Sequence, residues 1–167
     1  SAVALGLGLV GVLAGCGGDD GSSAAVSTTV PGVLAGPGQG ADILDAYEEH
    51  WSTFYEFINN VGPGPVGDYF AGDRRDDLPD QVADIAGRGL EVKGEPDLSP
   101  GPVTVSGDHA SFTDCQLDET YAVDRSTGAL VVPPGTELQA VEVEMLRERG
   151  TWKVSWVRYG QDGSCAR

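Results

Sequence analysis

Apolar residues recur at steps of three and four through residues 42–60, which is the spacing of one face of an α-helix. Glycines and prolines at residues 62–65 end this pattern. A short helical turn is predicted around residues 68–70 and a second long helix over residues 73–86, where Pro79 could introduce a kink. Helices therefore come first in the patterned part of the chain.

After the second helix the apolar period shortens to two, which predicts strands separated by Gly, Pro and Asp turns. Residues 148–151 (Glu-Arg-Gly-Thr) predict a hairpin, and Trp152, Val154 and Trp156 alternate onto one expected face. A change of apolar parity near Ala140 predicts a β-bulge there. The expected strands are residues 90–95, 103–105, 110–117, 136–149 and 151–159. This order predicts an α+β domain with an antiparallel sheet.

The first fifteen residues carry no charge and form an apolar run that is typical of a secretory signal peptide and too short for a spanning helix. The run leads into Leu13-Ala14-Gly15-Cys16, which resembles a bacterial lipobox. The resemblance implies cleavage before Cys16 and diacylglyceryl transfer to its thiol. An ordinary signal peptide with an incidental cysteine is the alternative. The basic n-region of such a signal is expected upstream of Ser1.

A tether follows the lipobox in this interpretation. Residues 17–40 contain seven glycines, two prolines and only two charged side chains, and no apolar face can be drawn through them. A Gly-rich coil of this length spans about 27 Å. We therefore expect a signal peptide (1–15), a lipidated cysteine with its linker (16–40) and a folded domain (41–167) held at the outer side of the cell membrane.

The charge of the chain excludes one class of partner. Ten Lys and Arg side chains face 26 Asp and Glu, so the formal net charge of the 167 residues is −16. Such a chain repels the phosphates of nucleic acids and of anionic lipids. No nucleic acid partner is expected, and attachment to the membrane would depend on the lipid anchor.

Several segments of the domain match the pattern of a known family. They are the aromatic helix at residues 46–54, the segment at residues 90–96, residues 107–115, residues 150–154 and the late Cys165. Through them the domain resembles the NTF2-like superfamily, particularly the exported NTF2-like domains of high-GC Gram-positive bacteria. The resemblance implies a cone, in which a strongly curved antiparallel sheet folds around the long first helix and leaves a pocket at its open end. Such cones include ketosteroid-isomerase-like and polyketide-cyclase-like enzymes as well as domains that only bind.

With Cys16 assigned to the lipobox, Cys115 and Cys165 remain as a natural pair in an exported protein. We therefore predict a disulfide between them. Two unpaired thiols are the alternative.

Asp114 is the one weak candidate for catalysis. In an isomerase-like site it would act as an acid or base, with Tyr47, Tyr55 or Tyr121 facing a developing oxyanion. In the other interpretation it is a structural acid bonded to a neighbouring strand or to an arginine. We favour the structural role, because no matching constellation of those enzymes occurs in the sequence.

No metal or cofactor is expected. His50 lies on the polar side of the first helix and His109 follows a turn, so both are predicted to face solvent. The aspartates of residues 73–80 lack the alternation of a calcium loop and suit the start of a helix, whose dipole favours negative charge.

Aromatic side chains supply the candidate binding residues. They either line a pocket for a small apolar ligand or fill the core, which is the default for a buried stripe. The candidates are Tyr47, Trp51, Tyr55, Trp152 and Trp156. The favoured hypothesis is a lipid-anchored, non-enzymatic domain that binds a small apolar ligand or an envelope protein. A pocket enzyme, or an accessory subunit of a lipid-import system, is the alternative.

Overall fold

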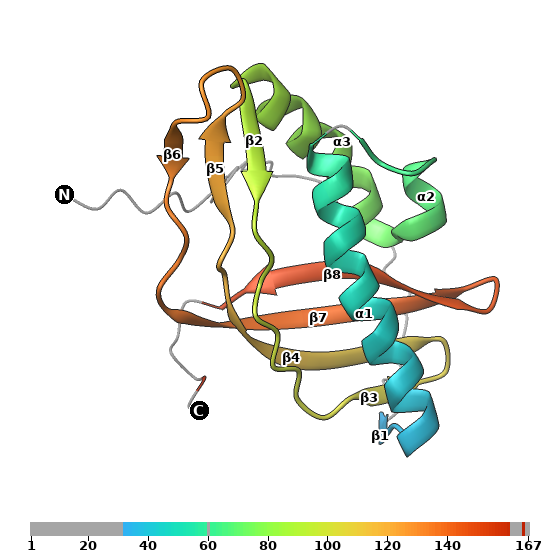
Figure 1. The fold of residues 1–167 in the computed structure, drawn as a ribbon. Helices are drawn as coiled ribbons and strands as arrows, with labels where there is room; N and C mark the ends of the chain where they lie inside the picture. The colour runs from blue at the N-terminus through green and yellow to red at the C-terminus, as the bar shows by residue number, and fades with distance from the viewer. Residues whose placement is uncertain (1–31, 60, 161–164, 166–167) are drawn as a thin grey trace, which may run out of the picture.

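The computed structural model describes residues 32–59, 61–160 and 165, in which helices lie against two antiparallel sheets (Figure 1). The helices are α1 (Pro37–Ile58), α2 (Val66–Tyr69) and α3 (Gly72–Gly87). The strands are β1 (Val33–Leu34), β2 (Leu90–Lys93), β3 (Thr104–Ser106), β4 (His109–Leu117), β5 (Tyr121–Asp124), β6 (Leu130–Val132), β7 (Leu138–Glu148) and β8 (Thr151–Tyr159).

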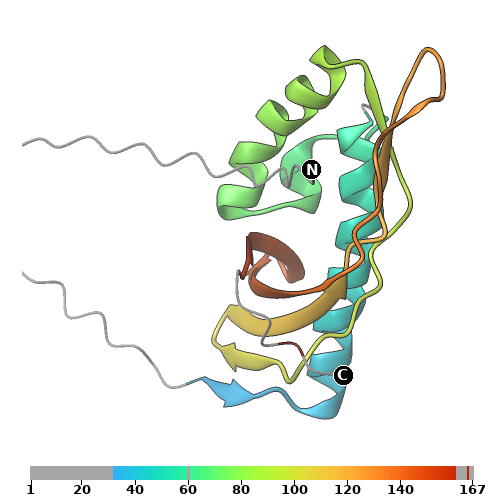
Figure 2. The same cartoon turned by 90° about the vertical axis from the view of Figure 1, so that its left-hand side faces the viewer.

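The five-stranded sheet has the order β1-β3-β4-β7-β8, and the three-stranded sheet has the order β2-β5-β6. Figure 2 shows the larger sheet curling beneath the helices, with the strands of the smaller sheet passing along α1. Helix α1 packs on β8 and α3, and α3 also contacts β8 and β2. The predicted α+β class, with helices packed in a curved antiparallel sheet, is confirmed.

Helix α1 begins earlier than the predicted residue 42, because Pro37 stands at its first turn, where the missing N–H of proline costs nothing. Its buried face is Ile43, Tyr47, His50, Trp51, Thr53, Phe54, Phe57 and Ile58. At the other end the Asn59 amide accepts from the Val92 N–H at 2.9 Å and donates to the Val92 carbonyl at 2.8 Å. This pair of bonds fixes the end of α1 to the free edge of β2.

Helix α3 follows the predicted range closely and continues through Pro79, which is exposed. Leu78 is its one buried residue. Its start is fixed on β8, where the Ala71 N–H donates to the Val154 carbonyl at 3.1 Å. Gly72 has a φ of 47°, and a Cβ there would lie 3.1 Å from the Ser155 carbonyl oxygen, so both the backbone and the space favour glycine.

Strands β5 and β6 were not predicted, because each is short and lacks a clear alternation. Their turn is organised by Asp124, whose carboxylate accepts from the hydroxyls and backbone N–H groups of Ser126 and Thr127. These bonds, the Ser126 hydroxyl first among them, lower the pKa of Asp124 to about 2. A local side-chain network thus supplies the turn signal that the apolar pattern lacks.

The predicted hairpin between β7 and β8 is confirmed. Glu148 pairs with Thr151, and Arg149 and Gly150 have φ values of 53° and 88°, as a tight turn of this kind requires. The bulge predicted at Ala140 is wrong, since the register shift lies between Glu144 and Met145. Ala140 itself lies in regular pairing with Cys115 on β4.

Ala140 faces outward and is covered by Gly160, whose N–H donates to the Ala140 carbonyl at 2.7 Å. The shift at Glu144 and Met145 has a larger consequence. Trp156 pairs with exposed Glu144, whereas Val154 pairs with buried Met145. Trp156 therefore lies on the opposite face from Trp152 and Val154, and the prediction of one shared face is wrong.

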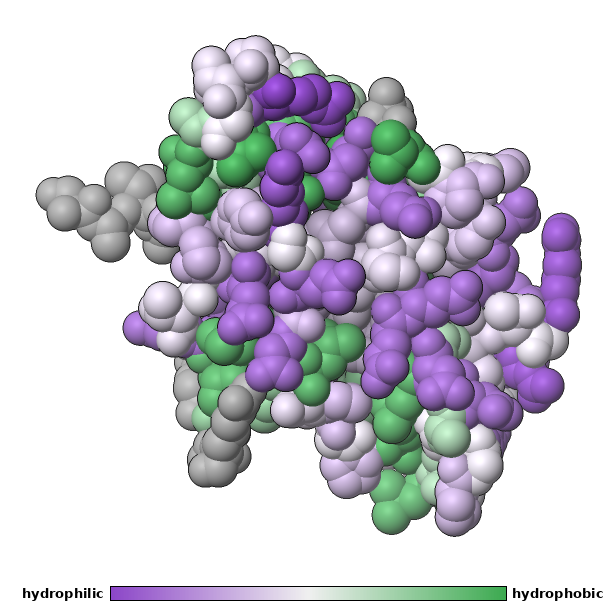
Figure 3. All heavy atoms as spheres, in the orientation of Figure 1, coloured by the Kyte–Doolittle hydropathy of each residue, from purple (hydrophilic) through white to green (hydrophobic). Residues whose placement is uncertain are grey.

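The face seen in Figure 3 is mainly hydrophilic, with separate hydrophobic patches. One patch, at the upper left, lies over β6, where Leu130 and Val131 are 60% and 49% exposed. Within the described residues, no helix is long and apolar enough to cross a membrane. The expected signal peptide and Cys16 lie outside the described residues.

Candidate functional site

Apart from Asp124 on its surface turn, the described groups with displaced pKa values lie between α1, α3 and the inner face of the larger sheet. Burial is the first cause of every one of these pKa shifts. The groups are Tyr47, His50, Tyr55, Arg74, Asp114 and Tyr159. A cluster of perturbed ionisable groups is a candidate functional site.

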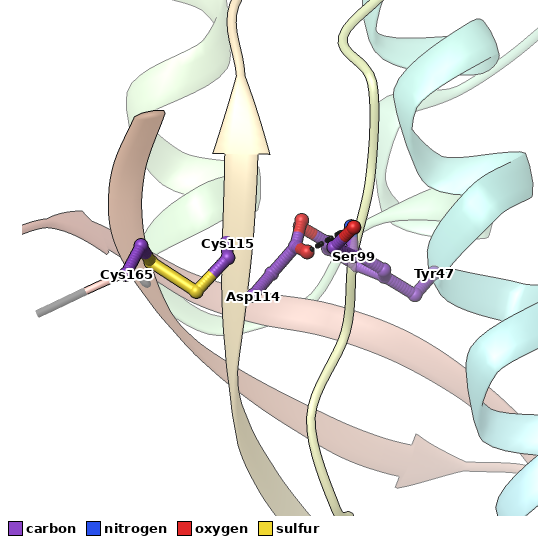
Figure 4. The surroundings of a disulfide bond; sticks show 5 residues. All are labelled: Tyr47, Ser99, Asp114, Cys115 and Cys165. Carbon is purple, nitrogen blue, oxygen red and sulfur yellow. Dashed lines mark hydrogen bonds between the residues drawn. A yellow bond between two sulfur atoms is a disulfide. The ribbon is translucent and has the colours of Figure 1, made fainter. Parts of the chain in front are cut away.

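Asp114 is fully buried on the inner face of β4 and points toward α1 (Figure 4). The Tyr47 hydroxyl donates to one of its carboxylate oxygens at 2.9 Å, and the Ser99 N–H donates to the other at 2.6 Å. Burial raises the pKa of Asp114, although the bonds from Tyr47 and Ser99 oppose that shift. Burial and the neighbouring carboxylate raise the pKa of Tyr47, so the tyrosine keeps its proton and remains the donor.

Both carboxylate oxygens of Asp114 are thus engaged by parts of the fold. The bond from Tyr47 joins α1 to β4, and the bond from Ser99 joins β4 to the segment that runs beside it, where Pro100 bridges to Asp114. This geometry matches what a structural acid would do. A general base would need an oxygen that is free to face a substrate.

The aromatic candidates do not come together in one pocket. Tyr47, Trp51 and Trp152 are at most 9% exposed and belong to the hydrophobic core. Trp51 stacks with the half-buried Tyr55 at a centroid distance of 6.0 Å. Trp156 lies on the outer face of the sheet. Core packing therefore accounts for the buried members, and Trp156 has a different environment.

His50 was predicted to face solvent, and this prediction is wrong. The side chain is 4% exposed, because Phe70 covers the face of α1 that was expected to be polar, at a centroid distance of 5.1 Å. Neither ring nitrogen has a hydrogen-bond partner among the described residues. Burial, assisted by the Arg74 charge, holds the pKa of His50 well below its usual value, so the ring is neutral near pH 7. His109 is exposed, as predicted.

Arg74 was not identified as a site residue from the sequence, where it stands among aspartates at the start of a polar helix. Its guanidinium carbon lies 3.9 Å from the centre of the Phe54 ring and 5.9 Å from that of Trp51. Its Nε is buried without a partner among the described residues. Other orphaned atoms in the interior are the Trp51 Nε1 and the amide of Gln116. The interior is therefore aromatic but contains several unpaired polar atoms.

The predicted disulfide is present between Cys115 and Cys165, with a Cα–Cα distance of 5.5 Å. Cys115 points to the outer face of β4, away from Asp114 on the inner face (Figure 4). Neighbouring residues of one strand thus serve opposite sides of the sheet. No group of three or more His, Cys, Asp or Glu side chains suited to a metal ion occurs within the part of the chain that the structure describes.

The outer face of the larger sheet carries an open groove of about 410 Å³. It crosses β3, β4, β7 and β8, and Trp156 lies in its wall. Arg158 stacks over Trp156 at 5.3 Å from its ring centre and pairs with Glu142 at 2.5 Å. Glu144 forms no ion pair with a described residue. Among the side chains lining the groove are Thr104, Ser111, Thr113, Glu142, Glu144 and Trp156.

A second hollow, of about 260 Å³, lies between the end of α1 and the loop after β2. Tyr55 forms part of its wall, together with Ser52, Glu56 and Asn59. Tyr55 is the only one of the aromatic candidates that lines it. The buried aromatic candidates Tyr47, Trp51 and Trp152 therefore do not line this hollow.

No known family profile and no curated protein matches the sequence. Similar solved structures include a Nostoc punctiforme protein of unknown function with a cystatin-like fold (12% identity, 79% of this chain and 97% of that one, TM-score 0.46). An NTF2-like protein with a cystatin-like fold from Novosphingobium aromaticivorans is 13% identical over 74% of this chain and 82% of that one, with a TM-score of 0.41. The intermembrane space region of chloroplast protein ARC6 is 18% identical over 69% and 94%, with a TM-score of 0.42. These likenesses concern the fold alone.

The burial of Asp114 predicts a specific pH dependence. A raised pKa means that the folded state binds the proton more tightly than the unfolded state, so this group's contribution to stability falls as pH rises from about 4 through the raised pKa. We expect Asp114→Asn to remove that fall. Urea unfolding of both proteins at several values between about pH 4 and pH 7 measures it.

Tyr47→Phe is the matched variant for this pair, because it keeps the ring and removes the hydroxyl donor. Loss of the bond raises the Asp114 pKa further, so the fall in stability should extend to higher pH, with a cost near neutrality of about 1–3 kcal/mol. Equal slopes for the parent and Asp114→Asn proteins would show that the carboxyl does not titrate as described.

The disulfide closes a loop with a sequence separation of 50. The double variant Cys115→Ala/Cys165→Ala should lose about 2–4 kcal/mol of unfolding free energy in urea, because the unfolded chain regains the entropy of that loop. Both proteins should carry Cys16→Ala, so that no third thiol can exchange. An unchanged urea midpoint on reduction of the parent would contradict a structural role for this bond.

Proposed function

We propose that this chain is a lipid-anchored, extracytoplasmic binding protein whose folded domain engages an envelope protein through the outer face of its larger sheet. The anchor is Cys16 and the tether is the glycine-rich segment that follows it. The proposal assigns no catalytic residue, in keeping with the hydrogen bonds that both oxygens of Asp114 accept from Tyr47 and Ser99.

The position of Trp156 is the observation that carries the proposal. The register shift in β7 and β8 moves this tryptophan out of the core and into the wall of the groove, while Trp51 and Trp152 remain buried. A tryptophan on a polar groove is the kind of side chain that dominates the energy of protein interfaces. The buried aromatic residues, by contrast, are occupied in packing against one another.

The chemistry of the groove favours a basic partner segment. Glu144 is exposed without a described ion-pair partner, and hydroxyls from Thr104, Ser111 and Thr113 offer hydrogen bonds along the groove. The net charge of −16 attracts a positively charged surface and repels an acidic one. We therefore infer that the partner presents Lys or Arg side chains beside an apolar contact for Trp156.

Anchoring is tested on the lipid itself. In a bacterial host with lipoprotein processing, the chain should incorporate an alkyne-tagged fatty acid and sediment with membranes, and Cys16→Ser should lose both properties. The Cys115→Ala/Cys165→Ala variant is the control, because it lacks the other two cysteines and should keep the label. Label retained in Cys16→Ser, or unchanged membrane partition, would contradict the lipobox interpretation.

Partner binding is tested by photo-crosslinking in those membranes. A photoreactive residue at Thr113, in the groove, should give a discrete protein adduct, whereas the same residue at Ala83, exposed on α3, should not. Adding Trp156→Ala should reduce the Thr113 adduct at least tenfold, with the fold checked by circular dichroism. Adducts of equal yield from both positions, or an adduct that survives Trp156→Ala, would argue against the groove as the interface.

A further inference from the structure

Arg74 is an unusual cation in a strongly acidic protein. Of the ten Lys and Arg residues, Arg75, Arg88, Lys93, Lys153 and Arg158 pair with carboxylates in the described structure. Arg74 makes no ion pair and no hydrogen bond with a described residue, and its Nε is shielded from solvent. An unpaired guanidinium in an apolar environment is costly unless something accepts its N–H groups.

The surroundings of Arg74 are rich in donors. The guanidinium lies over Phe54, beside Trp51, whose indole N–H is orphaned although the residue is 3% exposed. The hydroxyls of Tyr55 and of the part-exposed Tyr159 lie close enough to the guanidinium for its charge to lower their pKa values, although desolvation raises both pKa values overall. The region therefore presents several N–H and O–H donors, and its acceptors are the tyrosine oxygens and one ring nitrogen of neutral His50.

Two carboxylates lie in this region, and neither forms an ion pair with Arg74, although the charge of Asp77 favours the protonated guanidinium. Asp77, one helical turn along α3, is exposed and forms no ion pair with it. Asp118 faces Tyr55 and Tyr159, and one of its oxygens accepts bonds from the Thr120 hydroxyl at 2.6 Å and the Thr120 N–H at 3.1 Å. No carboxylate of a described neighbour is therefore in direct contact with the Arg74 guanidinium, and its Nε keeps no partner among them.

We propose that Arg74 anchors a binding site for a small oxyanion, specifically a carboxylate, between α1, α3 and the end of β8. The planar fork of a guanidinium matches a carboxylate with two parallel hydrogen bonds. Phe54 and Trp51 provide a water-poor wall that strengthens those bonds. Solvent reaches part of the Arg74 side chain, which gives a small anion a way in. This site does not depend on the groove at Trp156.

The test uses the full chain in detergent and benzoate as the probe, with titration followed by calorimetry and by tryptophan fluorescence at constant ionic strength. We expect saturable binding of benzoate that is weakened at least tenfold in Arg74→Met. Arg75→Met is the control, since Arg75 is the next residue, pairs with exposed Asp76 and should bind benzoate as the parent does.

Arg74→Lys is the second variant, since it keeps the charge and loses the fork, and it too should weaken binding if Arg74→Met does not fold. Phosphate and chloride are titrated in the same way as alternative anions. Binding of phosphate without benzoate would overturn the assignment to a carboxylate. A chloride response equal to that of benzoate, or benzoate binding unchanged in Arg74→Lys, would show that Arg74 is held by its contact with the aromatic rings alone.

Discussion

The burial of the aromatic face of α1 is the constraint on which the rest of this structure depends. A helix that presents Tyr47, Trp51 and Phe54 on one side cannot be covered by a flat sheet, because the rings project from the helix over a wide arc. The larger sheet therefore curls beneath α1, and α3 closes the side that the sheet does not reach (Figure 2). Burial of each large apolar side chain contributes about 1.5–3 kcal/mol to the free energy of unfolding.

Polar groups within this core determine how the covering elements are fixed. The Tyr47 hydroxyl has no access to water, so its bond to Asp114 sets the position of β4 along α1. Asp114 in turn needs a second donor, and Ser99 supplies it from the segment between the two sheets. At the C-terminal end of the helix, the Asn59 amide makes two hydrogen bonds to the backbone of Val92 and so holds β2 against α1. These few hydrogen bonds thus fix where β4 and β2 lie along α1, which apolar packing alone would not determine.

The sequence was sufficient for features that depend on local pattern. The period of α1 and the turn at Arg149 and Gly150 are local signals, and the disulfide was predicted from the number of cysteines together with the export that the N-terminal pattern predicts. The resemblance to NTF2-like domains supplied the curvature. The overall class could therefore be predicted without the structure.

Features that depend on which element covers which face could not be predicted. His50 looked polar because nothing in the sequence of α1 shows that Phe70 will return to cover it. Trp156 was predicted to share a face with Trp152 and Val154, because strict alternation ignores a register shift that depends on the pairing of β7 with β8. Arg74 had no signal of its own, since aspartates surround it in the chain and aromatic rings surround it in space.

The composition of α3 explains how a cation reached the interior. Leu78 is its one buried residue, and Arg74 precedes it by one turn on the same helical face. The partly buried Val82 and Ile85 add to the apolar cover that Leu78 gives the core, and the Arg74 guanidinium lies on Phe54. Methionine has a similar stem without charge, so it can preserve this packing. A difference in benzoate affinity between the parent and the Arg74→Met protein therefore reports on the charge and the N–H donors of Arg74. The apolar contact of the side chain is nearly the same in both proteins.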